Sequence, residues 1–198
     1  MLTSIGDVMR EAYKRGWITT RDGNISFRKN DEIFITPSGV KKYTIYPENL
    51  ISSYVDHNFE LINDHLTKPS GELEMHRLLQ TLDFNSYSES RAVVHLHPTN
   101  IIAAIYKGFD LQTLAQEFPE VSRYTKVGPT VPILPATSKE LADATFQAMS
   151  DASGEKLIYN IVGQANHGVC AIGKSPWDAF EHIERLEHIC QIVLASGV

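Results

Sequence analysis

Residues 92–98 read Ala-Val-Val-His-Leu-His-Pro, and this stretch places the chain's most informative histidines on a sheet. Its apolar and β-branched residues predict a buried strand over 92–97, after which Pro98 can open a helix. Because alternate residues of a strand face the same side of a sheet, His95 and His97 point the same way. Two imidazoles so arranged suit a borderline metal such as zinc, although such a pair alone is more often two surface or hydrogen-bonded histidines.

A third histidine lies in the sequence Gln-Ala-Asn-His-Gly at 164–168, between two apolar stretches. Taken alone, His167 is a turn histidine. Beside a glycine, however, the backbone can turn close to a site, and this makes His167 a good third ligand. Three histidines without a cysteine suit a catalytic metal that keeps one coordination position open.

The sequence Lys-Pro-Ser-Gly-Glu at 68–72 opens a predicted helix over 71–82, with Ser70 as its N-cap. The free N–H groups at a helix start favour a phosphate, and Ser70 adds a hydroxyl donor. A carboxylate in the first turn is also favoured by the helix dipole, so the position of Glu72 alone fits a structural role as well as a catalytic one. His76, one turn further on, is expected to pack rather than to act.

Two further short polar segments adjoin predicted strands. They are Gly-Asn-Ile-Ser at 23–26 and Thr-Pro-Ser-Gly at 36–39. Both are compatible with ordinary turns, and both can present N–H and O–H donors to a phosphate. Neither has the spacing of a nucleotide-binding loop.

The remaining periodicity predicts an α/β protein in which helices flank a mixed sheet. The expected helices cover 2–15, 71–82, a segment after Pro98, a short stretch near 111–117, 139–149 and a last helix that begins at Ser175-Pro176. The expected strands are 24–28, 32–36, two within 51–63, 92–97, 131–134, 157–162 and 169–172. Since no linker divides these elements, we expect a single domain over 1–198.

The composition limits the classes of binding partner that are expected. The 198 residues are 42% hydrophobic and carry a formal net charge of −6, so neither a nucleic acid nor an anionic membrane is an expected partner. An anionic substrate would therefore need a local pocket rich in positive charge or N–H groups. The two cysteines indicate no disulfide framework, and the absence of a membrane span or a targeting segment points to the cytoplasm by default.

The order of these motifs resembles the class II aldolase/adducin family. Gly-Asn-Ile-Ser, Ile-Thr-Pro-Ser-Gly, Lys-Pro-Ser-Gly-Glu, Val-Val-His-Leu-His-Pro and Asn-His-Gly follow one another at fitting intervals. The resemblance covers about residues 5–195 and includes sugar-phosphate aldolases, epimerases and dehydratases. It implies a three-layer α/β/α fold with a largely antiparallel central sheet.

The resemblance also implies roles for individual residues. It implies zinc, or another divalent transition metal, held by His95, His97 and His167, with Glu72 as the acid/base carboxylate. It implies that the phosphate of a small sugar substrate is held by Asn24, Ser38, Gly39, Ser70 and Gly71. Assembly as a homotetramer, with sites at the subunit interfaces, is a further expectation.

The sequence departs from the family pattern in two places. Gly71 stands where many members have a second hydroxyl residue before the glutamate, so one side-chain donor to the phosphate is missing. No tyrosine follows Tyr159, whereas the aldolase and epimerase carry one in a C-terminal tail that enters the neighbouring site. We therefore expect the second proton donor elsewhere, with Tyr124 and Glu120 as candidates.

The activity implied is that of a metal-dependent aldolase, which cleaves a small ketose 1-phosphate through a metal-stabilised enediolate. Dehydration, 4-epimerisation or decarboxylation of another sugar phosphate would use the same metal and carboxylate. A non-catalytic, adducin-like interaction domain is the alternative from a different class. The presence of all three histidines and of Glu72 favours an enzyme.

Overall fold

The computed structural model of the chain describes residues 1–30, 32–54, 68–81 and 90–197. Within these ranges one sheet has the strand order β3-β2-β1-β4-β6-β5. Its strands are β1 (Asn24–Lys29), β2 (Glu32–Ile35), β3 (Ile51–Tyr54), β4 (Ser90–Leu96), β5 (Ile161–Gln164) and β6 (Gly168–Gly173). Every neighbouring pair of these strands is antiparallel, and two isolated parallel bridges beside β5 make the pairing mixed. The expected largely antiparallel sheet is confirmed.

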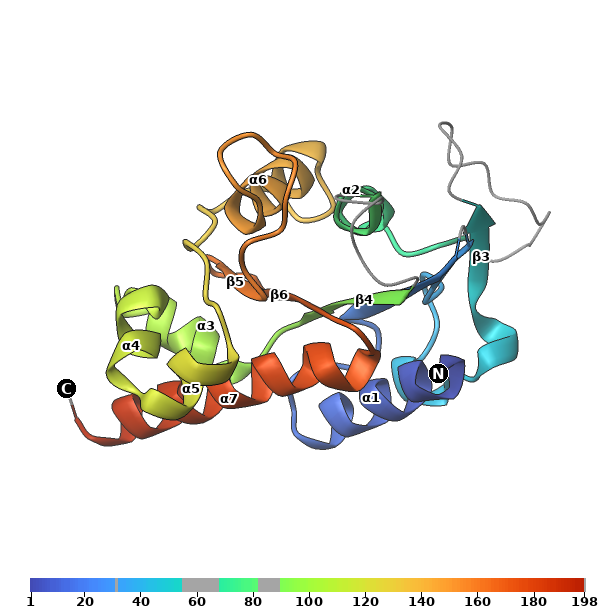
Figure 1. The fold of residues 1–198 in the computed structure, drawn as a ribbon. Coiled ribbons are helices and arrows are strands. Elements are labelled where there is room, and N and C mark those ends of the chain that lie inside the picture. Colours follow the sequence, from blue (N-terminus) through green and yellow to red (C-terminus); the bar gives the residue numbers. More distant parts are fainter. Residues whose placement is uncertain (31, 55–67, 82–89, 198) are drawn as a thin grey trace.

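Helices cover both faces of the sheet, which gives the expected three layers (Figure 1). One face is covered by α2 (Leu73–Thr81) and α6 (Lys139–Met149). The other layer holds α1 (Leu2–Lys14), α3 (Thr99–Tyr106), α4 (Leu111–Glu117), α5 (Pro119–Tyr124) and α7 (Pro176–Ala195). Short 3-10 turns at Lys42–Thr44 and Pro47–Asn49 join β2 to β3. No helix among the described residues is long and apolar enough to cross a membrane.

The alternation of side chains along the strands separates two hydrophobic cores. In β4, Val94 and Leu96 pack with α1 and α7, while Val93 packs with α2 and α6. His95 has the same parity as Val93, so its imidazole faces the side of α2. On the neighbouring strand β1, the residues that pair with His95 and Val93 are Asn24 and Ser26, which are both polar. A polar surface therefore lies between β1 and α2. The site described below lies at the edge of that polar surface.

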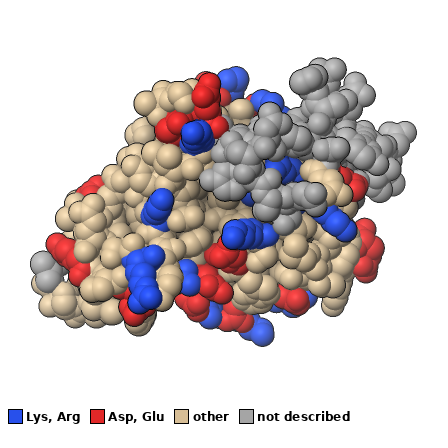
Figure 2. Space-filling model, in the orientation of Figure 1, with Lys and Arg blue, Asp and Glu red and all other residues tan. Residues whose placement is uncertain are grey.

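Charged side chains of both signs are mixed on the surface. Figure 2 shows Lys and Arg beside Asp and Glu over the face of the molecule that it presents. Elsewhere in the described chain, charges four residues apart pair, as Arg15 does with Glu11 at 2.8 Å and Arg185 with Glu181 at 2.7 Å. On the face that Figure 2 presents, positive charge for an anionic substrate would therefore have to come from a local pocket rather than from a broad basic area.

The structure corrects several sequence expectations. The strand expected at 131–134 is wrong, because Val131 forms only an isolated bridge to Gln164. Pro132 and Pro135 lack the N–H groups that a longer ladder would need. The strand expected at 157–162 begins only at Ile161, and the sequence did not reveal α5, which starts at a proline. Of the two strands expected within 51–63, β3 is confirmed and the rest lies outside the described residues.

Candidate active site

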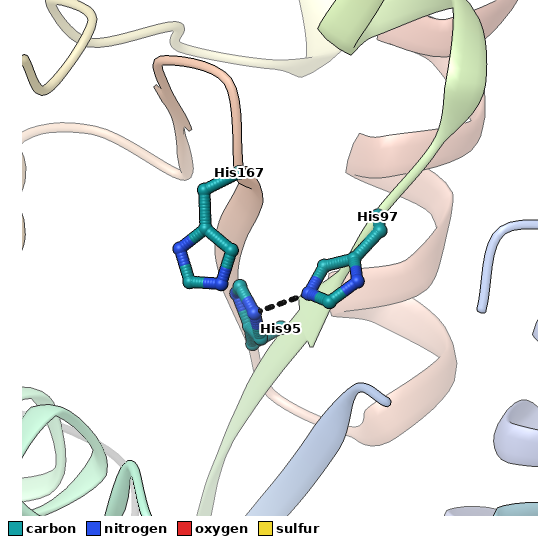
Figure 3. A group of neighbouring side chains, drawn as sticks. All are labelled: His95, His97 and His167. Atoms are coloured by element: carbon teal, nitrogen blue, oxygen red, sulfur yellow. Dashed lines mark hydrogen bonds between the residues drawn. The ribbon is translucent and has the colours of Figure 1, made fainter. Parts of the chain in front are cut away.

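Three imidazoles that are far apart in the sequence meet at one point of the sheet. His95 and His97 lie at the end of β4, and His167 lies in the turn that joins β5 to β6. Their ring centroids are 4.8, 4.9 and 5.2 Å apart, and one nitrogen of each ring lies within 4.8 Å of the others. Figure 3 shows the three rings turned toward a common point. The structure thus brings together the three predicted metal ligands.

Local backbone features make this approach possible. Asn166, just before His167, has a positive φ of 56°, which turns the chain back sharply. At Gly168 an added Cβ would lie 2.4 Å from the carbonyl oxygen of Leu96 and 2.7 Å from Cδ2 of His97. Only glycine therefore lets β6 run this close to the end of β4 and its imidazoles.

Hydrogen bonding shows how the imidazoles could receive a metal ion. Nδ1 of His95 lies 2.9 Å from the carbonyl oxygen of Val169, and because a carbonyl only accepts, Nδ1 carries the proton. In the neutral ring Nε2 then presents a lone pair toward Nε2 of His97, 2.9 Å away. A metal-binding histidine commonly donates its other N–H to a backbone carbonyl in this way. In Figure 3 the nitrogen of His167 that faces the other two rings is Nε2, while Nδ1, which is buried without a hydrogen-bond partner, points away from them.

Electrostatics also suits a cation at this point. Burial lowers the pKa of His97 to about 3, helped by the neighbouring His95 and His167, so this imidazole is neutral and able to coordinate. The pKa of His167 is lowered by burial and by His95. Three imidazoles beside a carboxylate form a set that fits a zinc-like divalent ion.

Glu72 lies against the imidazoles and is 7% exposed. Its Oε2 is 3.3 Å from Nε2 of His95, and its Oε1 is 3.8 Å from Nε2 of His167. Burial alone would raise the pKa of Glu72, but His95 and the N–H group of Asn24 hold this pKa below its usual value. Oε1 is buried and accepts no hydrogen bond, so this oxygen is available to a substrate or an ion.

Asn24 contacts Glu72 directly, a role that its sequence position did not reveal. It begins β1 opposite His95, and its Nδ2 donates a 2.8 Å hydrogen bond to Oε2 of Glu72. An amide N–H group in this position favours the ionised carboxylate. The second N–H of the same amide is left for other partners.

The two polar segments expected to hold a phosphate lie side by side. Pro37 and Pro69 form an antiparallel bridge. The N–H of Ser38 donates to the carbonyl of Lys68 at 2.8 Å, and the N–H of Ser70 donates to that of Thr36 at 3.1 Å. Ser38, Gly39, Ser70 and Gly71 thereby line the same cavity as the three imidazoles. Of residues 40–67, which separate the two segments in the sequence, 55–67 lie outside the described ranges.

All of the predicted site residues line one cavity of about 260 Å³. Its lining comprises Arg21, Asp22, Gly23, Asn24, Ser38, Gly39, Lys42, Ser70, Gly71, Glu72, His95, His97, Ala136, Thr137 and His167. Tyr124 and Glu120, the candidates for a second proton donor, do not line it. They belong to α5, which packs beside α7 on the opposite face of the sheet (Figure 1).

Sequence reasoning did not place Lys42 or Thr137, among other lining residues, in the site. Lys42 is only 3% exposed, and its ammonium donates a 2.5 Å hydrogen bond to the carbonyl of Pro37. Burial lowers the pKa of Lys42 to about 8, against the opposing effect of Asp22. Thr137 has a positive φ of 62°, which is unusual for a β-branched residue. Position 42 follows the 36–39 motif, but nothing in the sequence distinguishes the buried Lys42 from the exposed Lys41.

Comparison with known proteins identifies the family to which this chain belongs. A family model described as the class II aldolase and adducin N-terminal domain matches residues 3–194. The chain belongs to this family. Class II aldolases depend on a metal ion, and the three imidazoles form a possible site for it.

Individual relatives carry different activities. The chain is 28% identical over 193 residues to the L-fuculose phosphate aldolase of Methanococcus maripaludis, covering 96% of this chain and 94% of that protein. It is 24% identical to the methylthioribulose-1-phosphate dehydratase of Komagataella phaffii, covering 96% and 80%. The fold matches the crystal structure of L-fuculose-1-phosphate aldolase from Thermus thermophilus with a TM-score of 0.75 at 23% identity, covering 98% and 93%. Membership of the class II aldolase family thus leaves the reaction itself open.

Proposed function

We propose that this class II aldolase family member is a metal-dependent lyase, which cleaves a small ketose 1-phosphate reversibly to an aldehyde and an enediolate. The supporting observation is that three imidazoles, a buried carboxylate and two paired donor-rich segments line one cavity. Such a combination suits a substrate with a carbonyl at one end and an anion at the other.

We assign the metal site to His95, His97 and His167. A zinc ion, or another divalent transition metal, held there would supply Lewis acidity toward a substrate carbonyl oxygen. The directed lone pair of His95 and the approach of the three rings, with one nitrogen of each within 4.8 Å of the others, support this assignment. Three protein ligands would leave a coordination position for the substrate.

We assign the proton transfer to Glu72. Its carboxylate exchanges a proton with the substrate at the carbon or hydroxyl next to the carbonyl, a general acid/base role worth about 10²–10⁴-fold in rate. Its unpartnered Oε1 and its position against the imidazoles support this role. Asn24 holds the other carboxylate oxygen in place and keeps one N–H group for the substrate.

The phosphate subsite is assigned to Ser38, Gly39, Ser70 and Gly71, with Asn24 at its inner end. The N–H groups of Ser38 and Ser70 already pair the two segments, so their hydroxyl groups and the glycine N–H groups are the donors offered to the anion. A phosphate there would lie near the start of α2, where the helix dipole favours negative charge.

Two additional residues compensate for the hydroxyl that Gly71 lacks. An added Cβ on Gly71 would lie 3.1 Å from Cγ2 of Thr137, so Thr137 occupies the space where a larger residue would extend. We include Thr137 and the buried ammonium of Lys42 in the anion subsite, because both line the same cavity. Lys42 supplies the local positive charge that an acidic protein needs for an anionic substrate.

A second candidate reaction is dehydration of a sugar phosphate with the same metal and carboxylate. The match to a methylthioribulose-1-phosphate dehydratase over 96% of this chain supports it. Epimerisation and decarboxylation would use the same residues. The adducin-like alternative, a domain without activity, fits less well because the charged and metal-binding groups are all retained in one cavity.

The experiment is a product assay with zinc-loaded protein and a panel of ketose 1-phosphates. An aldehyde together with dihydroxyacetone phosphate supports aldol cleavage. A product that has lost water, or one epimerised without a change in mass, replaces it with the corresponding alternative. The variant Glu72→Gln serves as the control for contaminating enzymes, since its shape is matched and its acid/base group is removed.

We also propose assembly as a homotetramer in the cytoplasm, as the family resemblance implies. Sedimentation equilibrium measures the assembly directly. A monomer with full turnover would contradict a role for neighbouring subunits in the site.

A further inference from the structure

A row of buried polar side chains connects α2 to the candidate active site. Gln80 and His76, one helical turn apart on α2, face Ser26 and Asn24, which alternate along β1. Ser26, His76 and Gln80 are each 0% exposed. Burying so many polar groups is costly unless each has a partner, whereas apolar side chains would fill the same space without that requirement. Packing alone therefore does not account for this row.

The two ends of the row fix the direction of its hydrogen bonds. At one end, Nε2 of Gln80 donates to the carbonyl of Arg91 at 3.3 Å and to Oγ of Ser26 at 2.8 Å. At the other end the carboxylate of Glu72 only accepts, so the N–H group of Asn24 must face it. The carbonyl oxygen of Asn24 consequently faces Nε2 of His76 and requires a donor there.

The tautomer of His76 follows from these constraints. Nε2 carries the proton and donates to Asn24, while Nδ1 accepts from the hydroxyl of Ser26, 2.7 Å away. With the other tautomer, the amide of Asn24 would have to turn its oxygen toward an oxygen of Glu72. That arrangement would be repulsive for an ionised carboxylate.

We propose that His76 is a positioning residue, whose Nε2–H group holds the amide of Asn24 so that it donates to Glu72 and orients the acid/base carboxylate. This inference rests on the proposed function of Glu72 and extends it to a residue that does not line the cavity. Burial lowers the pKa of His76 to about 3, so the ring is neutral at physiological pH and has one N–H group to place. His76 is buried and outside the cavity lining, as the packing expected from the sequence requires, and the proposal adds a positioning role to that packing.

A matched pair of variants separates positioning from packing. In His76→Gln, the side-chain amide nitrogen falls near the original Nε2 and can still donate to Asn24. In His76→Asn, the side chain reaches only the position of Nδ1, so the bond to Ser26 can persist while the donor to Asn24 is lost. Both variants remove an imidazole, and zinc content and the unfolding midpoint are measured for each.

Positioning predicts a difference in kcat. His76→Asn should lower kcat by about 10–100-fold, the usual effect of losing an outer hydrogen bond to a metal site, with KM little changed because the phosphate subsite is intact. The kcat of His76→Gln should stay within about fivefold of the wild-type value, because the hydrogen bond to Asn24 is partly retained. Equal kcat values for the two variants would overturn the proposal.

A second measurement does not depend on turnover. Long-range ¹H–¹⁵N NMR of the zinc-loaded, ¹⁵N-histidine-labelled protein, with His76 assigned by its loss in His76→Gln, reports which ring nitrogen carries the proton. A proton on Nε2 supports the proposal, and a proton on Nδ1 overturns it. If the wild type turns over no sugar phosphate, the proposed function fails, while this spectrum still decides whether Nε2 of His76 donates to Asn24.

Discussion

Replacing Gly168 with alanine tests how closely the backbone must approach the imidazoles. The added Cβ would lie 2.4 Å from the carbonyl oxygen of Leu96, 2.7 Å from Cδ2 of His97 and 3.2 Å from Cε1 of His95. The φ of Gly168 does not lie in the left-handed region, so the conflict is steric rather than conformational. Overpacking of this kind costs about 1–3 kcal/mol, and relieving it must move β6 or the ring of His97. We expect the zinc affinity to fall at least about tenfold, the effect usually seen when a contact that orients a metal ligand is lost.

Gly173 provides the matched control at the other end of β6. An added Cβ there would lie 2.4 Å from the backbone nitrogen of Ala179, a clash as severe as that at Gly168 but away from the imidazoles. Urea unfolding should show a similar loss of stability for Gly168→Ala and Gly173→Ala, while a chelator-competition titration should show weakened zinc binding only for Gly168→Ala. Wild-type zinc affinity in Gly168→Ala, or equal weakening in both variants, would refute the account of this contact.

Two other predictions concern the carboxylate and the ammonium of the cavity. Glu72→Gln should keep the fold and zinc but lower kcat by about 10²–10⁴-fold, because the side chain keeps its shape and loses its acid/base function; full activity in a steady-state assay would remove Glu72 from the mechanism. The KM for the sugar phosphate should rise as the pH increases through the Lys42 pKa of about 8, because the ammonium is charged below that pKa and neutral above it. Since the second ionisation of a phosphate lies near pH ~6, the substrate charge is constant over this range. Lys42→Arg should remove this pH dependence in KM profiles, and an unchanged profile would show that Lys42 does not contact the anion.

Helices flanking a mixed sheet could be predicted from local patterns, while the three layers and the full set of site residues were implied by the resemblance to the family. Alternation along 92–97 places His95 on one face of a strand, and the five motifs occur in a recognisable order. All of the motif residues line a single cavity in the structure, although their catalytic and binding roles stay predictions. The same locality explains the error at 131–134, where apolar residues look like a strand but the prolines beside them prevent a ladder.

The residues that sequence reasoning missed act through contacts between distant segments. His76 looks like one more residue on the buried face of a helix until Ser26 and Asn24 are placed opposite it on β1. Lys42 belongs to the cavity only because a short 3-10 turn brings its ammonium to the carbonyl of Pro37. Such pairings depend on the register of β1 and on the bridge between residues 37 and 69, which no local pattern encodes.

The zinc content of the purified protein, determined by elemental analysis beside that of His167→Ala, tests the central claim most directly. The account predicts about one zinc ion per chain in the wild type and its loss in the variant, because three distant histidines would then form one site. No metal in either protein after zinc is supplied, or equal metal in both, would contradict a catalytic metal centre at His95, His97 and His167.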